Sequence, residues 1–207
     1  MAQALAPTTA HDANGAHVTP EGLPVLHLSG PALTAAMEAL VSGSEEQGGV
    51  ERYLEATALK VSLFQDAFAD GAARVERDAF GYLCAYMAPV RRRIGVYLEG
   101  SAYFDLRDGI AALLDGAEDT STADARIAAF CARFPQDKAH RWVRNLAAEL
   151  LHSTDPERYP LMCRWVWDAR ANSGVLREIW YGADQNHAAI DIPDGYATFV
   201  MLRQELS

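Results

Sequence analysis

The feature that most constrains the fold is the stretch from Phe134 to Trp180, which contains all four tryptophans of the 207-residue chain. A buried aromatic side chain hides roughly 150–250 Å² of surface. Four indoles within so short a stretch must therefore pack against one another, against the rest of the chain or against a partner. We expect this stretch to form the heart of the core.

Within this stretch, Asp137 is a good N-cap for a helix that ends near Ser153. Pro156 and Pro160 then interrupt helical geometry and predict a structured turn. Beyond them, the pattern predicts a second, shorter helix over 161–170 and a third element from Val175 to Trp180. The apolar side chains that recur at helical spacing in the first helix are Trp142, Val143, Leu146, Leu150 and Leu151.

The remainder of the chain also shows three- and four-residue apolar spacing with little β signal. The clearest case runs from Val50 to about Ala69. The pattern there places Val50, Leu54, Ala58, Val61, Phe64 and Phe68 on one face. Further helices are predicted over 31–42, 74–89, 90–98, 103–116, 122–132 and 196–206. The fold class is therefore all-α, an irregular bundle of about seven to nine helices.

Two segments interrupt this helical pattern. Residues 1–29 contain no Lys or Arg and show no apolar periodicity, which predicts a flexible or extended N-terminal leader. Residues 30–207 are expected to form a single helical domain. Inside it, the polar sequence of residues 42–49 predicts a linker between two helices.

Composition narrows the range of functions that this chain can have. The net charge is −10, which argues against nucleic acid as a partner because phosphate binding needs a basic footprint. No apolar run is long enough to span a membrane, and no signal peptide is evident. Three cysteines without paired spacing favour a reducing compartment, and we expect the protein to be cytoplasmic.

Catalytic and metal-binding motifs are sparse. Glu149 and His152 form an E-x-x-H pair as in di-iron bundles, but the sequence contains no second copy. The alternative is that His152 stabilises a helix C-terminus. Cys84 and Cys131 are expected to be buried and inert, and Cys163 less inert because Arg164 follows it. No motif predicts a metal or a cofactor.

Two arginine-rich clusters are candidates for anion binding. Arg91, Arg92 and Arg93 are consecutive, so they point about 100° apart around a helix and cannot all face one ligand. The second cluster follows three-residue steps on one helix face, and a solvated surface is the alternative for it. Its members are Lys138, Arg141 and Arg144, joined by Arg158 and Arg164.

The segment from Ala147 to Asp168, with Leu-His, Pro and Tyr-Pro before its Asp, resembles a stretch of some helical proteins related to helix-hairpin-helix DNA glycosylases. The resemblance covers about a tenth of the chain. The segment is not preceded by the Leu-Pro-Gly-Val-Gly hairpin of those proteins. The resemblance implies that Asp168 is a functional residue.

Two hypotheses for function follow. The first is a soluble helical protein-interaction or accessory protein that uses a Trp- and Arg-rich face within 134–180, with self-association through the C-terminal helix as one form. The second is an enzyme or nucleic-acid-processing protein with a pocket around His152, Asp155, Arg158, Tyr159, Cys163 and Asp168. Exposed indoles would favour the first, and buried indoles beside a polar pocket the second. The candidate binding residues are Arg141, Trp142, Arg158, Tyr159, Trp165, Trp167 and Trp180.

Overall fold

The computed structural model describes residues 17–18, 24–25, 31–46, 48–181 and 189–207. In these ranges the fold is all-α, as predicted, with eight α-helices and one antiparallel pair of two-residue strands. Most of the predicted leader, residues 1–29, lies outside the described residues. The elements are β1 (His17–Val18), β2 (Pro24–Val25), α1 (Pro31–Glu45), α2 (Gly49–Phe68), η1 (Ala72–Arg74), α3 (Arg77–Cys84), η2 (Gly95–Tyr97), α4 (Ala102–Leu114), η3 (Thr120–Thr122), α5 (Ala123–Ala132), η4 (Lys138–His140), α6 (Trp142–Thr154), α7 (Val175–Tyr181) and α8 (Tyr196–Glu205).

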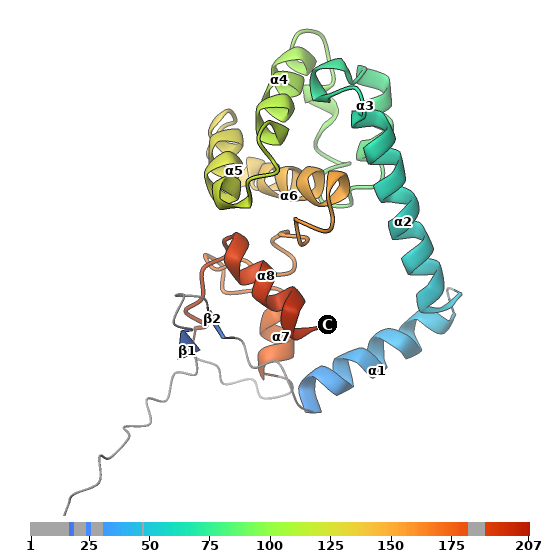
Figure 1. The fold of residues 1–207 in the computed structure, drawn as a ribbon, viewed down its shortest axis with the longest axis vertical. Helices are drawn as coiled ribbons and strands as arrows, with labels where there is room; N and C mark the ends of the chain where they lie inside the picture. The colour runs from blue at the N-terminus through green and yellow to red at the C-terminus, as the bar shows by residue number, and fades with distance from the viewer. Residues whose placement is uncertain (1–16, 19–23, 26–30, 47, 182–188) are drawn as a thin grey trace, which may run out of the picture.

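Helix α6 is the centre of the main body. Nine of its 13 residues are buried, and it packs against α2, α4 and α5. Figure 1 shows α3, α4 and α5 gathered around it together with the second half of α2, while α7 and α8 lie at the other end of the molecule. One hydrophobic cluster runs through the body from Phe64 to Leu202. The expectation that the 134–180 stretch supplies the heart of the core is confirmed, because Trp142, Leu146 and Trp167 belong to this cluster.

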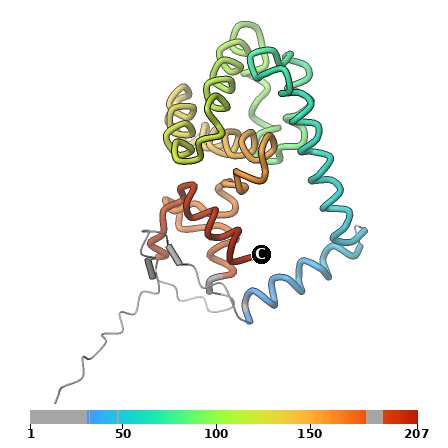
Figure 2. The backbone as a smooth tube through the Cα atoms, in the orientation of Figure 1, coloured from blue at the N-terminus to red at the C-terminus, as the bar shows by residue number. Residues whose placement is uncertain are grey.

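Helix α1 and the first half of α2 form an arm, defined here as residues 31–59, which leaves the body along α2 and contacts α7 through α1. The tube in Figure 2 shows α1 crossing from the end of α7 to the start of α2. Gly48 and Gly49 separate the two helices with φ angles of 101° and 84°, which glycine adopts without steric cost. The change of direction between α1 and α2 thus coincides with two glycines.

The predicted linker over 42–49 is too long. Helix α1 continues past Ser42 and Gly43 to Glu45. The Ser44 hydroxyl donates a hydrogen bond to the carbonyl of Val41 at 2.7 Å, so this serine is accommodated inside the helix. The helix ends at Glu45, and Gly48 and Gly49 then have positive φ angles.

The predicted helix over 90–98 is wrong. Residues 89–98 form tight turns and the single 3₁₀ turn η2, with Arg91 N–H donating to Met87 C=O at 3.0 Å. Pro89 cannot donate a helical hydrogen bond, and β-branched Val90, Ile94 and Val96 have low helix propensity. Apolar spacing alone therefore predicted a helix that this segment does not form.

The predicted second helix over 161–170 is also wrong. Residues 155–174 form a structured loop that is fixed by its own backbone pairing, including hydrogen bonds of 2.9 and 3.2 Å between Asp168 and Ser173. The Arg164 N–H donates to the side chain of Asn145 on α6 at 2.9 Å instead of to a helical carbonyl. These pairings replace the helical ones and hold the loop on α6.

No helix among the described residues combines the length and the apolar character that crossing a bilayer would require.

Gly174, at the end of this loop, has a φ of 127°, and a Cβ built there would lie 2.6 Å from the carbonyl oxygen of Val166. We predict that Gly174→Ala lowers the free energy of unfolding by at least about 2 kcal/mol, because strained backbone and a clash with backbone combine. Gly95→Ala is the control, since no atom lies within 4 Å of its Cβ position. Denaturant unfolding of the two variants measures the difference, and equal stabilities would contradict the prediction.

Candidate functional site

The indoles are divided between core and surface. Trp142 is buried, with its ring 5.6 Å from that of Tyr97 and 6.3 Å from that of Phe134. Trp167 is fully buried, and its Nε1–H donates to the carbonyl of Ile192 at 3.0 Å. Trp165 is 53% exposed. The Trp180 side chain lies outside the described part of the structure, so Trp165 is the one exposed indole among the three described.

Tyr159 belongs to the core as well. Its side chain is fully buried, and its hydroxyl donates to the carbonyl of Ala117 at 2.5 Å. Arg126 donates to the same hydroxyl and also lies over the ring, with its Cζ 5.7 Å from the centroid. Burial raises the pKa of Tyr159. This tyrosine links the loop after α4 to the loop after α6.

The arginines predicted to form an anion-binding surface are paired with carboxylates of the same chain. Arg141 donates to Asp168 at 2.7 Å, and Arg164 lies 3.8 Å from the same carboxylate. Asp168 is buried, and burial lowers the pKa of Arg164. Arg144 pairs with Asp194 at 3.5 Å. The cluster therefore holds the 155–174 loop and the segment before α8 against α6.

Glu149 and His152 both lie on α6 but contact different parts of the protein. Glu149 is buried and forms an ion pair with Lys60 of α2. The Nδ1 of His152 lies 2.8 Å from the carbonyl of Tyr159, and burial lowers the pKa of this imidazole. Among the described residues, no group of three or more His, Cys, Asp or Glu side chains is arranged to hold a metal ion.

The cysteines are free thiols. Burial raises the pKa of Cys84 to about 12, and it also raises the pKa of Cys131 and of Cys163. The expectation that Cys163 is the least inert thiol is wrong, because its side chain is fully buried and Arg164 points to Asp168. Cys131 is the least buried of the three.

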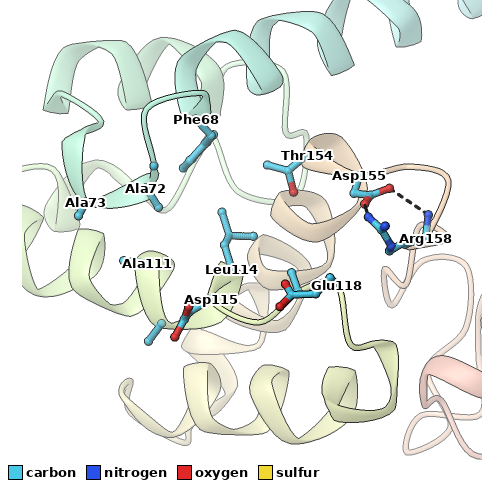
Figure 3. A pocket seen from close by; sticks show the side chains of 13 residues that line it. Phe68, Ala72, Ala73, Ala111, Leu114, Asp115, Glu118, Thr154, Asp155 and Arg158 are labelled. Atoms are coloured by element: carbon cyan, nitrogen blue, oxygen red, sulfur yellow. Dashed lines mark hydrogen bonds and ion pairs between the residues drawn. The ribbon is translucent and has the colours of Figure 1, made fainter.

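A pocket of about 720 Å³ opens beside Arg158. Figure 3 shows Phe68, Leu114 and Thr154 around it, at the C-terminal ends of α2, α4 and α6. Its lining side chains are mostly small and apolar. They include alanines from η1, from α4 and from the loop after α4. Its lining residues are Phe68, Gly71, Ala72, Ala73, Ala111, Ala112, Leu114, Asp115, Ala117, Glu118, Thr154, Asp155 and Arg158.

The electrostatics of this pocket are predominantly negative. Three helix C-termini, each carrying a partial negative charge, meet the carboxylates of Asp115, Glu118 and Asp155. Arg158 forms an ion pair with Asp155 across three residues (Figure 3). The Thr154 hydroxyl donates to the carbonyl of Leu150 at 2.8 Å, as part of its own helix. The lining offers neither an activated nucleophile nor an anion site.

Of the six residues proposed to surround a pocket, Asp155 and Arg158 line this one. His152 contacts the loop backbone at Tyr159, and Asp168 contacts Arg141 and Arg164. The sequence therefore identified one wall of the pocket. The other walls come from the ends of α2 and α4, which are brought together only by packing.

The arm is the surface that sequence reasoning missed. The predicted apolar stripe of α2 is buried at Phe64 but exposed at Leu54, where 65% of the residue is accessible. On α1, Met37, Leu40 and Val41 share a face and are each about half exposed. The sequence did contain a sign of this surface. The apolar stripe of α2 runs from Val50 to Phe68, which is longer than the part of the helix that packs on the body.

Comparison of the chain with protein-family models, with curated proteins and with solved structures finds no match.

Asp168 provides a test of the paired arginines. We predict that Asp168→Asn destabilises the fold by about 3 kcal/mol, because removing one partner of a buried ion pair leaves the Arg164 guanidinium uncompensated. Arg158→Gln, which removes a more exposed pair, should cost less than about 1 kcal/mol. Denaturant unfolding at neutral pH compares them, and equal losses would argue against the buried network.

His152 should make stability depend on pH. Because its pKa is lower in the folded state, the unfolded chain binds more protons, and stability is lost as the pH falls below the unfolded value of 6.5. We predict that the denaturant midpoint falls less steeply between neutral and mildly acidic pH in His152→Asn, whose amide can replace Nδ1 at the Tyr159 carbonyl. Identical pH profiles for the variant and the parent protein would exclude this contribution.

Proposed function

We propose that this chain is a helical protein-interaction or accessory protein, which acts by binding another polypeptide. The observation that carries the proposal is the arm. All residues from Glu51 to Leu59 are exposed, although the same apolar stripe is buried further along α2. An isolated amphipathic helix gains little stability in water without a surface on which to bury its apolar face.

The composition of the arm supports a binding role. Its large exposed apolar side chains recur over both helices, and contiguous exposed patches of this kind are typical of protein interfaces. Trp165, exposed within the 134–180 stretch, is a second contact candidate because tryptophans are enriched among the residues that dominate interface energy. Free thiols support a reducing compartment, the cytoplasm, as the place where this happens.

The alternative, an enzyme or nucleic-acid-processing protein, draws support from the pocket beside Arg158. Its acidic rim favours a cationic or neutral ligand over a nucleic acid, whose phosphates would be repelled. Neither His152 nor Asp168 lines it. The binding hypothesis therefore has the stronger support.

Photo-crosslinking tests the proposal in the cells that make the protein. With p-benzoylphenylalanine in place of Leu59, we expect a covalent adduct of defined mass. The same group in place of exposed Glu157 should give none. Leu54→Glu should abolish the adduct while changing the free energy of unfolding by less than about 0.5 kcal/mol, since Leu54 makes little contact with the body. The absence of any adduct from the arm would refute the proposal.

A further inference from the structure

The pocket beside Arg158 lies where three helices end. Phe68 is the last residue of α2, Leu114 of α4 and Thr154 of α6, and all three line the cavity (Figure 3). The last carbonyls of a helix have no partner within the helix, and its C-terminus carries about half a negative charge. Three such ends around one cavity of about 720 Å³ concentrate negative potential inside it.

None of these helix ends is neutralised by a cation of its own helix. The last turns of α2 and α4, both inside the described chain, contain no basic residue. The last turn of α6 contains His152, but burial lowers the pKa of this imidazole below its usual 6.5, so it is uncharged at neutral pH. Lys, Arg or a charged His stabilises a helix C-terminus. A cation that stabilises these three ends must therefore come from another part of the chain or from a ligand.

The rest of the lining leaves this negative charge in excess. Of the 13 described residues around the pocket, only Arg158 is basic. Arg158 donates to the carboxylate of Asp155 from both its backbone N–H and its guanidinium, so its charge is matched within the lining. In the part of the chain that the structure describes, no ion pair involves Asp115 or Glu118. Two carboxylates therefore add to the three helix ends.

The other lining residues present carbon to the cavity. Phe68 contributes an aromatic ring, a group that attracts cations, and Leu114 an aliphatic side chain. The Thr154 hydroxyl is already bonded to a carbonyl of its own helix. The remaining small residues, which leave the volume free, are Gly71, Ala72, Ala73, Ala111, Ala112 and Ala117. Small-molecule sites have volumes of roughly 300–1,000 Å³ and mostly apolar walls with a few polar groups, as this pocket does.

We propose that this pocket binds a small organic amine, in which a protonated nitrogen is attached to an apolar group. The nitrogen lies among the three helix C-termini and the carboxylates of Asp115 and Glu118. The apolar group lies against Phe68, Leu114 and the alanines. All of these residues lie outside the arm, so the site is independent of the protein-binding role proposed above.

Three ligands that share a phenyl group test this site. Phenethylamine, phenethyl alcohol and phenylacetate differ mainly in having a positive, a neutral and a negative end. In titrations followed by amide-resolved NMR, we expect the amine to bind at least about tenfold more tightly than the alcohol, and the carboxylate not to bind. The shifted amides should cluster around Ala72, Ala112 and Thr154. An amine that does not bind, or that binds no better than the alcohol, would overturn the proposal.

Two variants separate the charge from the cavity. Asp115→Asn/Glu118→Gln should weaken amine binding at least about tenfold and leave alcohol binding unchanged, because both side chains are exposed and only their charge is removed. Ala112→Trp, at an exposed position of α4, should abolish binding of both ligands because it places an indole in the cavity.

The matched control is Glu51→Gln/Asp191→Asn, which removes the same charge from exposed positions outside the lining. It should bind the amine as the parent chain does, and circular dichroism checks that all three variants keep their helices. Amine binding that is unchanged in Asp115→Asn/Glu118→Gln would refute the site, as would an equal loss of binding in the control.

Discussion

The burial of α6 is the constraint on which the rest of the fold depends. A helix enclosed on most of its surface can tolerate a carboxylate only if a cation is supplied, and Lys60 supplies it to Glu149 from α2. This pair joins α2 to α6 across 89 residues of sequence. It determines where the second half of α2 lies, and through the continuous helix it also determines where the exposed first half points.

The tryptophan-rich stretch supports this arrangement from inside. Trp142 and Trp167 fill the core, so the side chains that first suggested a contact face are mostly structural. The loop that carries Trp167 is held by polar pairing around Asp168, where a helix would have used its own backbone. A tryptophan in the sequence therefore indicates either a core position or a contact surface. Which of the two applies depends on the residues that pack around its side chain.

The helices and most of their boundaries could be predicted because apolar spacing, capping residues and glycines act locally. The 155–174 loop could not be predicted. The hydrogen bonds that hold it in place of helical ones are made with Asn145 and Arg141, which lie outside the segment in the sequence. The pocket was predictable only at Asp155 and Arg158, because its other walls are helix ends assembled by packing. The arm was visible as a periodic stripe, but its exposure depends on the position of every other helix. Whether residues 30–207 form one domain stays a prediction.

Gly48 and Gly49 also bear on how this chain can vary. They join two regular helices, and neither of their left-handed φ angles is readily adopted by another residue. Replacing either glycine would change the angle between α1 and α2, and α1 would then lose its contact with α7. Because α7 supplies Leu176 to the hydrophobic core, variation at this elbow is restricted by packing at the far end of α1.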